Sequence, residues 1–172
     1  MLRVIGFCIV ILGSAGFGYA YIQTKKEALK ELEKFIYFFR LLESEVSYHK
    51  ESLPEAVVRV GRKMEKGMGE IFSSIEETCV YSRQKNFGEA WHFSVKPYLE
   101  NTQLCMKERN VINGFADYAG YEDKSLQESM IRQYIDELER CRKEKEVEIS
   151  EKQRVVMGIS SILGLMISII LL

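Results

Sequence analysis

SLQESMIRQYIDELERCRKEKEVEISEKQRVVMGISSILGLMISIILL, residues 125–172, is the segment from which the architecture of the chain is most easily read. It opens with Ser125-Leu126-Gln127-Glu128, which has the form of a capping box at a helix start. Apolar residues then recur at helical spacing, most of residues 142–154 are charged, and no helix breaker occurs before Gly158. We therefore predict one long helix that leaves a folded domain, crosses a charged neck and ends in the uncharged residues 155–172.

A second uncharged run, residues 4–22, lies at the other end of the chain. The whole chain of 172 residues is 28% charged, but nearly all of that charge falls between the two runs. An apolar helix of about 18–20 residues is about 27–30 Å long, close to the hydrocarbon thickness of a bilayer. We predict an amino-terminal transmembrane anchor in residues 1–24, a soluble helical bundle in 25–154 and a carboxyl-terminal transmembrane helix in 155–172.

The first run also has features of a secretory signal peptide. Arg3 precedes it, and small residues gather near its end. However, the run is longer than a usual signal core, and lysines follow it directly. We therefore favour an uncleaved anchor.

The middle of the chain has the periodicity of an all-α bundle of about six helices. From residue 25 to 49, apolar residues recur three, four and seven positions apart: Leu29, Leu32, Ile36, Phe39 and Val46. Capping boxes at Ser52 and Asn86 predict two further helix starts, and Gly67 and Gly69 are expected to separate two helices. The other helices are expected over residues 70–82, 86–99 and 102–118, with Pro97 as a kink or end and Gly120 as a terminator.

Both uncharged runs carry small residues four positions apart, which places them on one helix face. In the first run these are Ser14 and Gly18, with Gly16 and Ala20 as a second such pair, and in the second run they are Ser160, Gly164 and Ser168. Small residues let membrane helices pack closely, either on each other or on neighbouring membrane proteins. Ordinary tolerance of glycine in membrane helices explains the pattern equally well. Both interpretations stay open.

Charge patterning indicates a membrane orientation and excludes one class of partner. Lysines and arginines gather on the inner side of both runs, which predicts that the middle domain faces the cytoplasm and both termini the opposite side. The net charge is −1, and acids alternate with bases, so nucleic-acid binding is not expected. The charged neck, residues 142–154, is expected to be a solvated helix surface, with a docking site as the alternative.

No pattern in the sequence indicates catalysis, a cofactor or a metal. The cysteines (Cys8, Cys79, Cys105 and Cys141) are scattered, which favours small apolar fillers over disulfides or zinc ligands. His49 and His92 lie far from metal-ligand spacing, and the carboxylate pairs Glu76-Glu77 and Glu43/Glu45 fit solvated faces. Phosphate loops and nucleophile elbows are absent. We therefore predict that the chain is not an enzyme.

Several short motifs carry a family resemblance by their order along the chain. They are Leu53-Pro54-Glu55-Ala56, Glu89-Ala90-Trp91, Gly120-Tyr121-Glu122-Asp123 and Gln127, set between the two apolar ends. In this arrangement the chain resembles the stage III sporulation protein AB family over essentially its whole length. It departs from the family pattern at Asp117-Tyr118-Ala119, where a leucine-glycine turn would be expected beside Gly120.

The resemblance implies a fold, a place and a set of partners. It implies a helical domain similar to the platform protein F of type II secretion, held in the outer forespore membrane and facing the mother-cell cytoplasm. It implies a non-catalytic platform linking mother cell and forespore, with a secretion-type ATPase and other membrane and ring components as partners. It also gives architectural roles to the matching residues, which are Leu53, Pro54, Ala56, Trp91, Gly120, Asp123 and Gln127. Self-association is compatible with such a platform.

Two other functions compete with the platform. A membrane-tethered regulatory domain would bind a soluble regulator independently of any secretion-type complex. A small membrane enzyme would need a polar pocket with perturbed carboxylates.

Overall fold

The structure is a computed structural model that describes the backbone of residues 2–48, 52–81, 86–118 and 124–171. Within these ranges, the side chains of residues 2–15, 17, 79–81, 118, 124, 157, 160, 161, 163–165 and 167–171 are not described. The described residues form six α-helices and one 3-10 turn, with no strand among them, so the predicted all-α class is confirmed. The elements are α1 (Leu2–Tyr48), α2 (Leu53–Gly61), α3 (Lys66–Tyr81), α4 (Phe87–Glu100), α5 (Met106–Gly114), η1 (Phe115–Tyr118) and α6 (Lys124–Leu171).

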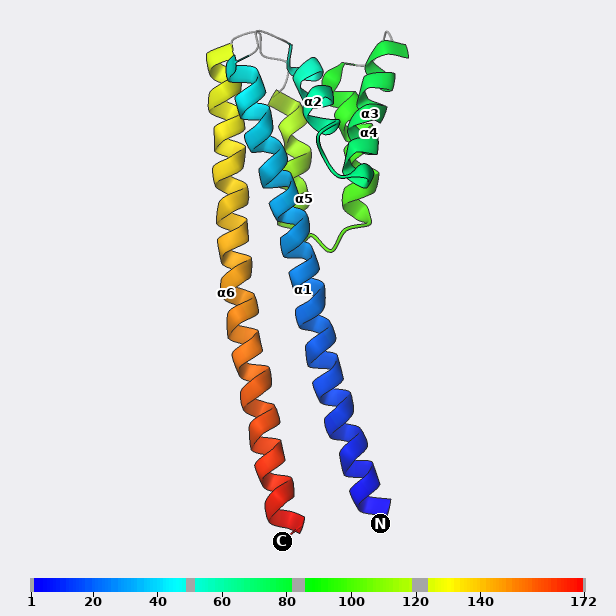
Figure 1. The fold of residues 1–172 in the computed structure, drawn as a ribbon, viewed down its shortest axis with the longest axis vertical. Helices are drawn as coiled ribbons and strands as arrows, with labels where there is room; N and C mark the ends of the chain where they lie inside the picture. The colour runs from blue at the N-terminus through cyan, green and yellow to red at the C-terminus, as the bar shows by residue number, and fades with distance from the viewer. Residues whose placement is uncertain (1, 49–51, 82–85, 119–123, 172) are drawn as a thin grey trace.

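Two long antiparallel helices, α1 and α6, form the frame of the molecule (Figure 1). The four short helices gather at one end of this frame and make a head, while both chain termini lie at the other end. We call the part of the two long helices beyond the head, residues 2–28 and 145–171, the stalk. As predicted, α6 continues without a break through the neck into the last uncharged residues. The α1 helix also runs without a break through position 24, a continuity that the sequence pattern did not indicate.

The described residues include no helical segment with both the length and the apolar character needed to cross a membrane.

Helix starts in the head follow the predicted caps at two places. The Glu55 carboxylate accepts a hydrogen bond from the backbone N–H of Ser52 at 3.2 Å, at the start of α2. The Asn86 side chain accepts one from the N–H of Glu89 at 2.9 Å, at the start of α4. Each bond satisfies a backbone donor that the first helical turn leaves without a partner.

Other predicted helix ends are wrong. Gly67 and Gly69 lie within the first turn of α3, because the break after α2 falls in the turn at residues 62–65. Pro97 lies inside α4, which continues to Glu100, so Pro97 does not end the helix, and the alternative of a kink stays a prediction. Ser125 lies inside the first turn of α6 instead of capping it.

The fifth helix begins later than predicted, at Met106, because its start is set by a pair of residues that the sequence reading passed over. Glu108 accepts a hydrogen bond from the N–H of Cys105 at 2.8 Å. Cys105 is therefore an exposed residue at a helix start, and its interpretation as an apolar filler is wrong, whereas Cys141 is buried as expected.

The core of the head is built around Trp91, which is fully buried. Its ring lies 5.0 Å from that of Phe115 and 5.9 Å from that of Phe72, centre to centre. Its indole N–H donates to the carbonyl of Ile112 at 3.3 Å, so the polar edge of the ring has a partner inside the core. Trp91 thereby joins α3, α4, α5 and η1 in one apolar cluster with α1.

Candidate interaction site

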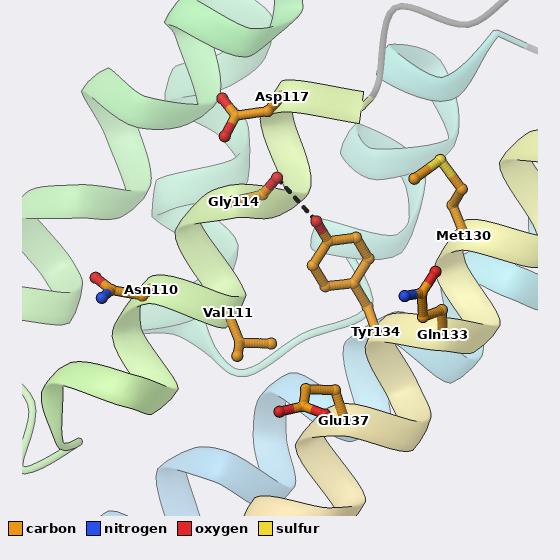
Figure 2. Close-up of a pocket in the computed structure, with 8 residues that line it drawn as sticks. All are labelled: Asn110, Val111, Gly114, Asp117, Met130, Gln133, Tyr134 and Glu137. Atoms are coloured by element: carbon orange, nitrogen blue, oxygen red, sulfur yellow. Dashed lines mark hydrogen bonds between the residues drawn. The ribbon is translucent and has the colours of Figure 1, made fainter.

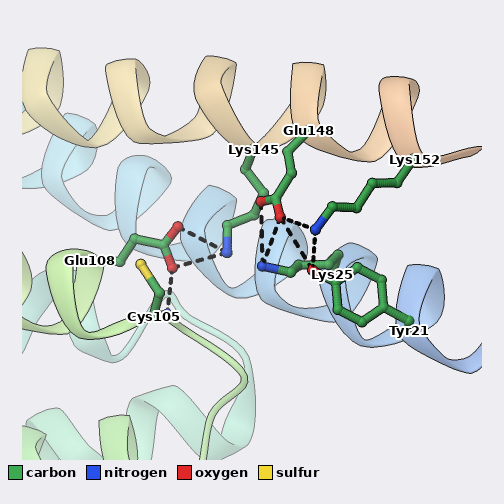
Figure 3. Close-up of polar contacts among 7 residues, drawn as sticks. All are labelled: Tyr21, Lys25, Cys105, Glu108, Lys145, Glu148 and Lys152. Carbon is green, nitrogen blue, oxygen red and sulfur yellow. Dashed lines mark hydrogen bonds and ion pairs between the residues drawn. The ribbon is translucent and has the colours of Figure 1, made fainter.

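A polar cluster holds the two stalk helices in register just below the head (Figure 3). The carboxylate of Glu148 on α6 lies 3.2 Å from the ammonium of Lys25 on α1 and 2.8 Å from that of Lys152 on its own helix. Lys152 also contacts the hydroxyl of Tyr21, and its ammonium lies 4.4 Å from the centre of the Tyr21 ring. These contacts tie residue 21 to 152 and residue 25 to 148, which fixes how far α6 is displaced along α1.

The charges in this cluster shift one another. Hydrogen bonds from Lys152 first, and then from Lys25, lower the pKa of the Glu148 carboxyl to about 2, against the opposing effect of burial. Burial alone would lower the pKa of Lys25, but its contact with Glu148 outweighs burial and raises the pKa. The hydrogen bond to Glu148 also raises the pKa of Lys152. All three groups are therefore charged at neutral pH, and the cluster functions as an ionic latch between the helices.

One helical turn farther from the head than this latch, α1 and α6 approach each other closely at a glycine. A β-carbon placed on Gly18 would lie 3.2 Å from both terminal methyl carbons of Val156, whereas one placed on Gly16 would meet nothing within 4 Å. Gly18 was predicted to be a packing residue, and it lies on the side of α1 that faces α6. Its predicted partners Ser14, Ser160, Gly164 and Ser168 lie outside the described side chains.

The exposed surface of the stalk changes character along its length. On α6 the side chains of Ser150, Glu151, Gln153 and Arg154 are exposed. The exposed large side chains described beyond them are all apolar and lie four, three and four positions apart on one face: Val155, Ile159, Ile162 and Met166. Soluble surfaces rarely carry such a continuous apolar stripe, so this face is suited to a nonpolar surrounding.

A buried ion pair fastens the head to the top of the stalk. The Lys145 ammonium on α6 lies 2.9 Å from the Glu108 carboxylate on α5, and both side chains are at most 5% exposed. The carboxylate also accepts the Cys105 N–H, so each of its oxygens has a partner (Figure 3). Because unpaired charges are costly inside a protein, this pair defines where α5 meets α6.

A groove of about 660 Å³ lies between α5, η1 and α6 (Figure 2). Its polar groups are largely engaged by neighbours. The Gly114 carbonyl accepts from Tyr134 at 2.9 Å, and Asp117 lies 3.1 Å from Nε2 of His92. Glu137 pairs with Arg140 on its own helix. The groove is thus an open, hydrogen-bonding surface, and among its described lining residues no nucleophile is paired with a base.

His92 has a structural position on α4. Its Nδ1 lies 3.0 Å from the side-chain oxygen of Asn113 on α5, and its Nε2 faces Asp117 on η1. The ring therefore links three elements of the head. Among the described residues no group of histidine, cysteine and carboxylate side chains is placed to hold a metal ion.

The residues assigned to architecture lie in different places. Leu53, Ala56 and Trp91 are buried in the core cluster that the described residues form. Pro54 is half-buried in a groove between α2 and α3, and Gln127 is half-buried near the start of α6. Gly120 and Asp123, like His49, lie outside the described residues.

The sequence reading missed the latch and the buried ion pair of Glu108 with Lys145. The latch had a weak signal, because Tyr21 and Lys25, and Glu148 and Lys152, are each four residues apart beside an uncharged run. The pair of Glu108 with Lys145 had none, since it joins residues 37 apart that look like ordinary surface charges in their own helices.

Comparison with known proteins identifies this architecture. The family model for stage III sporulation protein AB matches residues 3–172. Stage III sporulation protein AB of Bacillus subtilis (strain 168) is 18% identical over 172 residues, which cover 100% of both chains. A solved structure of a stage III sporulation protein AB has the same fold, with a TM-score of 0.63 and 19% identity over 72% of this chain and 97% of that one. The resemblance read from the motif order is therefore confirmed, and the chain belongs to the stage III sporulation protein AB family.

Proposed function

We propose that this member of a sporulation family is a non-catalytic membrane platform in a secretion-like complex that links mother cell and forespore. In this proposal the uncharged ends of α1 and α6 anchor the chain in the outer forespore membrane, and the head lies in the mother-cell cytoplasm. There the chain docks the secretion-type ATPase of the complex and contacts other membrane and ring components.

One observation carries the proposal. The latch brings two uncharged chain ends, 4–22 and 155–172, side by side, and the described exposed face of α6 becomes an apolar stripe beyond Arg154. Apolar area that is left outside the folded head needs a nonpolar partner, and a bilayer supplies one for both helices at once. A polar head on such a stalk presents a rigid surface at a fixed distance from the membrane.

Docking on the neck is supported by its exposed residues. Lys143, Val147 and Glu151 lie four residues apart on one face of α6, and the Val147 side chain is 57% exposed among charges. Lys145 and Ile149 on the other face are buried, so deleting residues 142–152 would damage the head–stalk junction as well as this face. Surface substitutions test the face without that damage.

The experiment compares two sets of charge reversals in the full chain. Lys143→Glu with Glu151→Lys alters the neck face, and Lys66→Glu with Glu70→Lys alters exposed positions on α3 as a matched control with the same net charge. We expect the neck variant alone to lose co-purification with the secretion-type ATPase of the complex, while both stay in membranes washed with carbonate. Unchanged co-purification of the neck variant would refute docking there, and release of the parent chain by carbonate would refute the anchor.

A further inference from the structure

The contacts between the stalk helices place tyrosines and basic residues at one level. Gly18 meets Val156, and Tyr21 meets Lys152, so Tyr19 on α1 lies at the level of Arg154 on α6. Four residues therefore form what we call the collar: Tyr19, Tyr21, Lys152 and Arg154. They come from the two ends of the sequence, and only the antiparallel register assembles them.

The collar lies where the surface of the stalk changes from charged to apolar. Above it, Gln23, Thr24 and Lys26 are exposed on α1, and Ser150 and Glu151 on α6. Below it runs the apolar stripe that begins at Val155. The Tyr19 side chain is 71% exposed, although it is large and aromatic. Tyrosine favours such a boundary because its ring suits a nonpolar layer and its hydroxyl a wet one.

The two cations of the collar, Lys152 and Arg154, differ in the contacts that they make with other described residues. Lys152 is held by Glu148 and Tyr21. Arg154 is exposed, and among the described residues it makes no ion pair, although the exposed Glu151 stands three residues before it on the same helix. A guanidinium at the edge of an apolar surface is suited to a phosphate, which it can bind through two parallel hydrogen bonds.

We propose that the collar lies in the lipid headgroup layer and that Arg154 binds the phosphate of an anionic lipid. This inference rests on the proposed membrane anchor. It adds the depth at which the stalk lies in the membrane and the lipid group that Arg154 binds. The helical rise puts Val155 ten residues, or about 15 Å, below the ion pair of Lys145 with Glu108. The head thus stands clear of a headgroup layer that is about 5–7 Å thick.

Depth is tested with the full chain in phosphatidylcholine vesicles whose acyl chains carry bromine near the headgroup. Tyr19→Trp adds a fluorophore at the collar, and Tyr37→Trp adds one at an exposed position on the same helix, about 27 Å farther along. Trp91 is buried in the head and gives the same background in both variants. We expect the bromine to quench the added fluorescence of Tyr19→Trp by at least half and to leave that of Tyr37→Trp unchanged.

Lipid charge is tested in the Tyr19→Trp chain with a minor fraction of brominated phosphatidylglycerol or brominated phosphatidylcholine. A single arginine near an anionic surface predicts up to about a five-fold enrichment of the anionic lipid, and so stronger quenching by it. Arg154→Gln should abolish this preference. Lys143→Gln, an exposed cation about 16 Å higher on α6, should keep it.

The outcomes separate this inference from the proposed function. A chain that stays in carbonate-washed vesicles but shows no quenching of Tyr19→Trp, or equal quenching of Tyr37→Trp, overturns the collar and leaves the anchor standing. Equal quenching by brominated phosphatidylglycerol and brominated phosphatidylcholine in the Tyr19→Trp chain that keeps Arg154 overturns the binding of Arg154 to an anionic lipid. A chain that carbonate removes from the vesicles overturns the anchor and the collar together.

Discussion

Trp91 is the residue on which most elements of the head converge. Its ring contacts aromatic rings of α1, α3, α4 and η1, and its indole N–H is satisfied inside the core. We expect Trp91→Ala to lower the free energy of unfolding by about 3–5 kcal/mol, because it empties the centre of a packed cluster. Urea denaturation followed by circular dichroism measures the change. Met106→Ala, at a position 79% exposed, should cost little, and equal losses in both variants would contradict a central role.

The ion pair of Glu108 with Lys145 stabilises the fold mainly because either charge would be costly if it were buried without the other. Lys145→Met leaves a buried carboxylate without its cation and should cost about 3–5 kcal/mol. Adding Glu108→Gln to that variant should restore much of the loss, because the amide oxygen can still accept the Cys105 N–H. Denaturation of the single and double variants measures this coupling. A double variant that is less stable than Lys145→Met alone would contradict it.

Glu148 makes the stalk sensitive to acid. Its pKa is lowered to about 2 in the folded chain, below the ordinary value of 4.5, so the latch contributes stability above the ordinary pKa and loses it as pH falls toward 2. We expect the melting temperature of the parent chain to fall more steeply between about pH 5 and pH 2 than that of Glu148→Gln. Glu151→Gln, an exposed neighbour, should follow the parent curve. Parallel curves for the parent and Glu148→Gln would exclude the latch as a source of stability.

At the scale of the helix, two glycines set the distances between elements. A β-carbon on Gly61 would lie 2.3 Å from the β-carbon of Phe72, so α2 can approach α3 only without a side chain there. We expect Gly61→Ala to cost about 1–3 kcal/mol, the usual penalty for overpacking. A β-carbon on Gly67 would meet nothing within 4 Å, so Gly67→Ala is the matched control in the same thermal melt. A neutral Gly61→Ala would show that the helices can separate freely.

Gly18 likewise sets the distance between the two stalk helices. Gly18→Leu should push α1 away from Val156, whereas Gly16→Leu should leave the pair unchanged. Spin labels at exposed Lys26 and Arg154 report the separation by electron–electron distance measurement. We expect a shift of the distance distribution in Gly18→Leu alone and its partial reversal by Val156→Ala. Identical distributions in the two leucine variants would mean that Gly18 does not set the spacing.

Sequence reasoning recovered the elements whose cause is local. The bond from Ser52 to Glu55 and the cap at Asn86 lie within four residues of the helices they start, so the pattern alone indicates them. The role of Gly61 could not be seen, because its constraint comes from Phe72 across the interface with α3. For the same reason the sequence could not show that Glu108 faces Lys145 or that Tyr19 stands level with Arg154.

At the scale of the whole molecule, the head is a compact core mounted on two helices that run its full height and beyond it. Family membership and the fold are established, and the proposed platform role depends on whether the ends of the long helices lie in a membrane. The neck, residues 142–154, overlaps the latch and the collar, which share Tyr21 and Lys152. A substitution at Tyr21 or Lys152 would therefore alter the latch and the collar together, whereas Lys143 belongs to the neck alone.

The register between α1 and α6 has a mechanical meaning. Sliding one helix along the other by a single turn would separate Lys25 from Glu148 and drive the Val156 methyls off Gly18 in the same movement. The two helices, each about 70 Å long, are thus held together at two levels, so that neither can slide along the other. A torque applied to the head would therefore turn both long helices together, so that the far ends of α1 and α6 rotate as one unit.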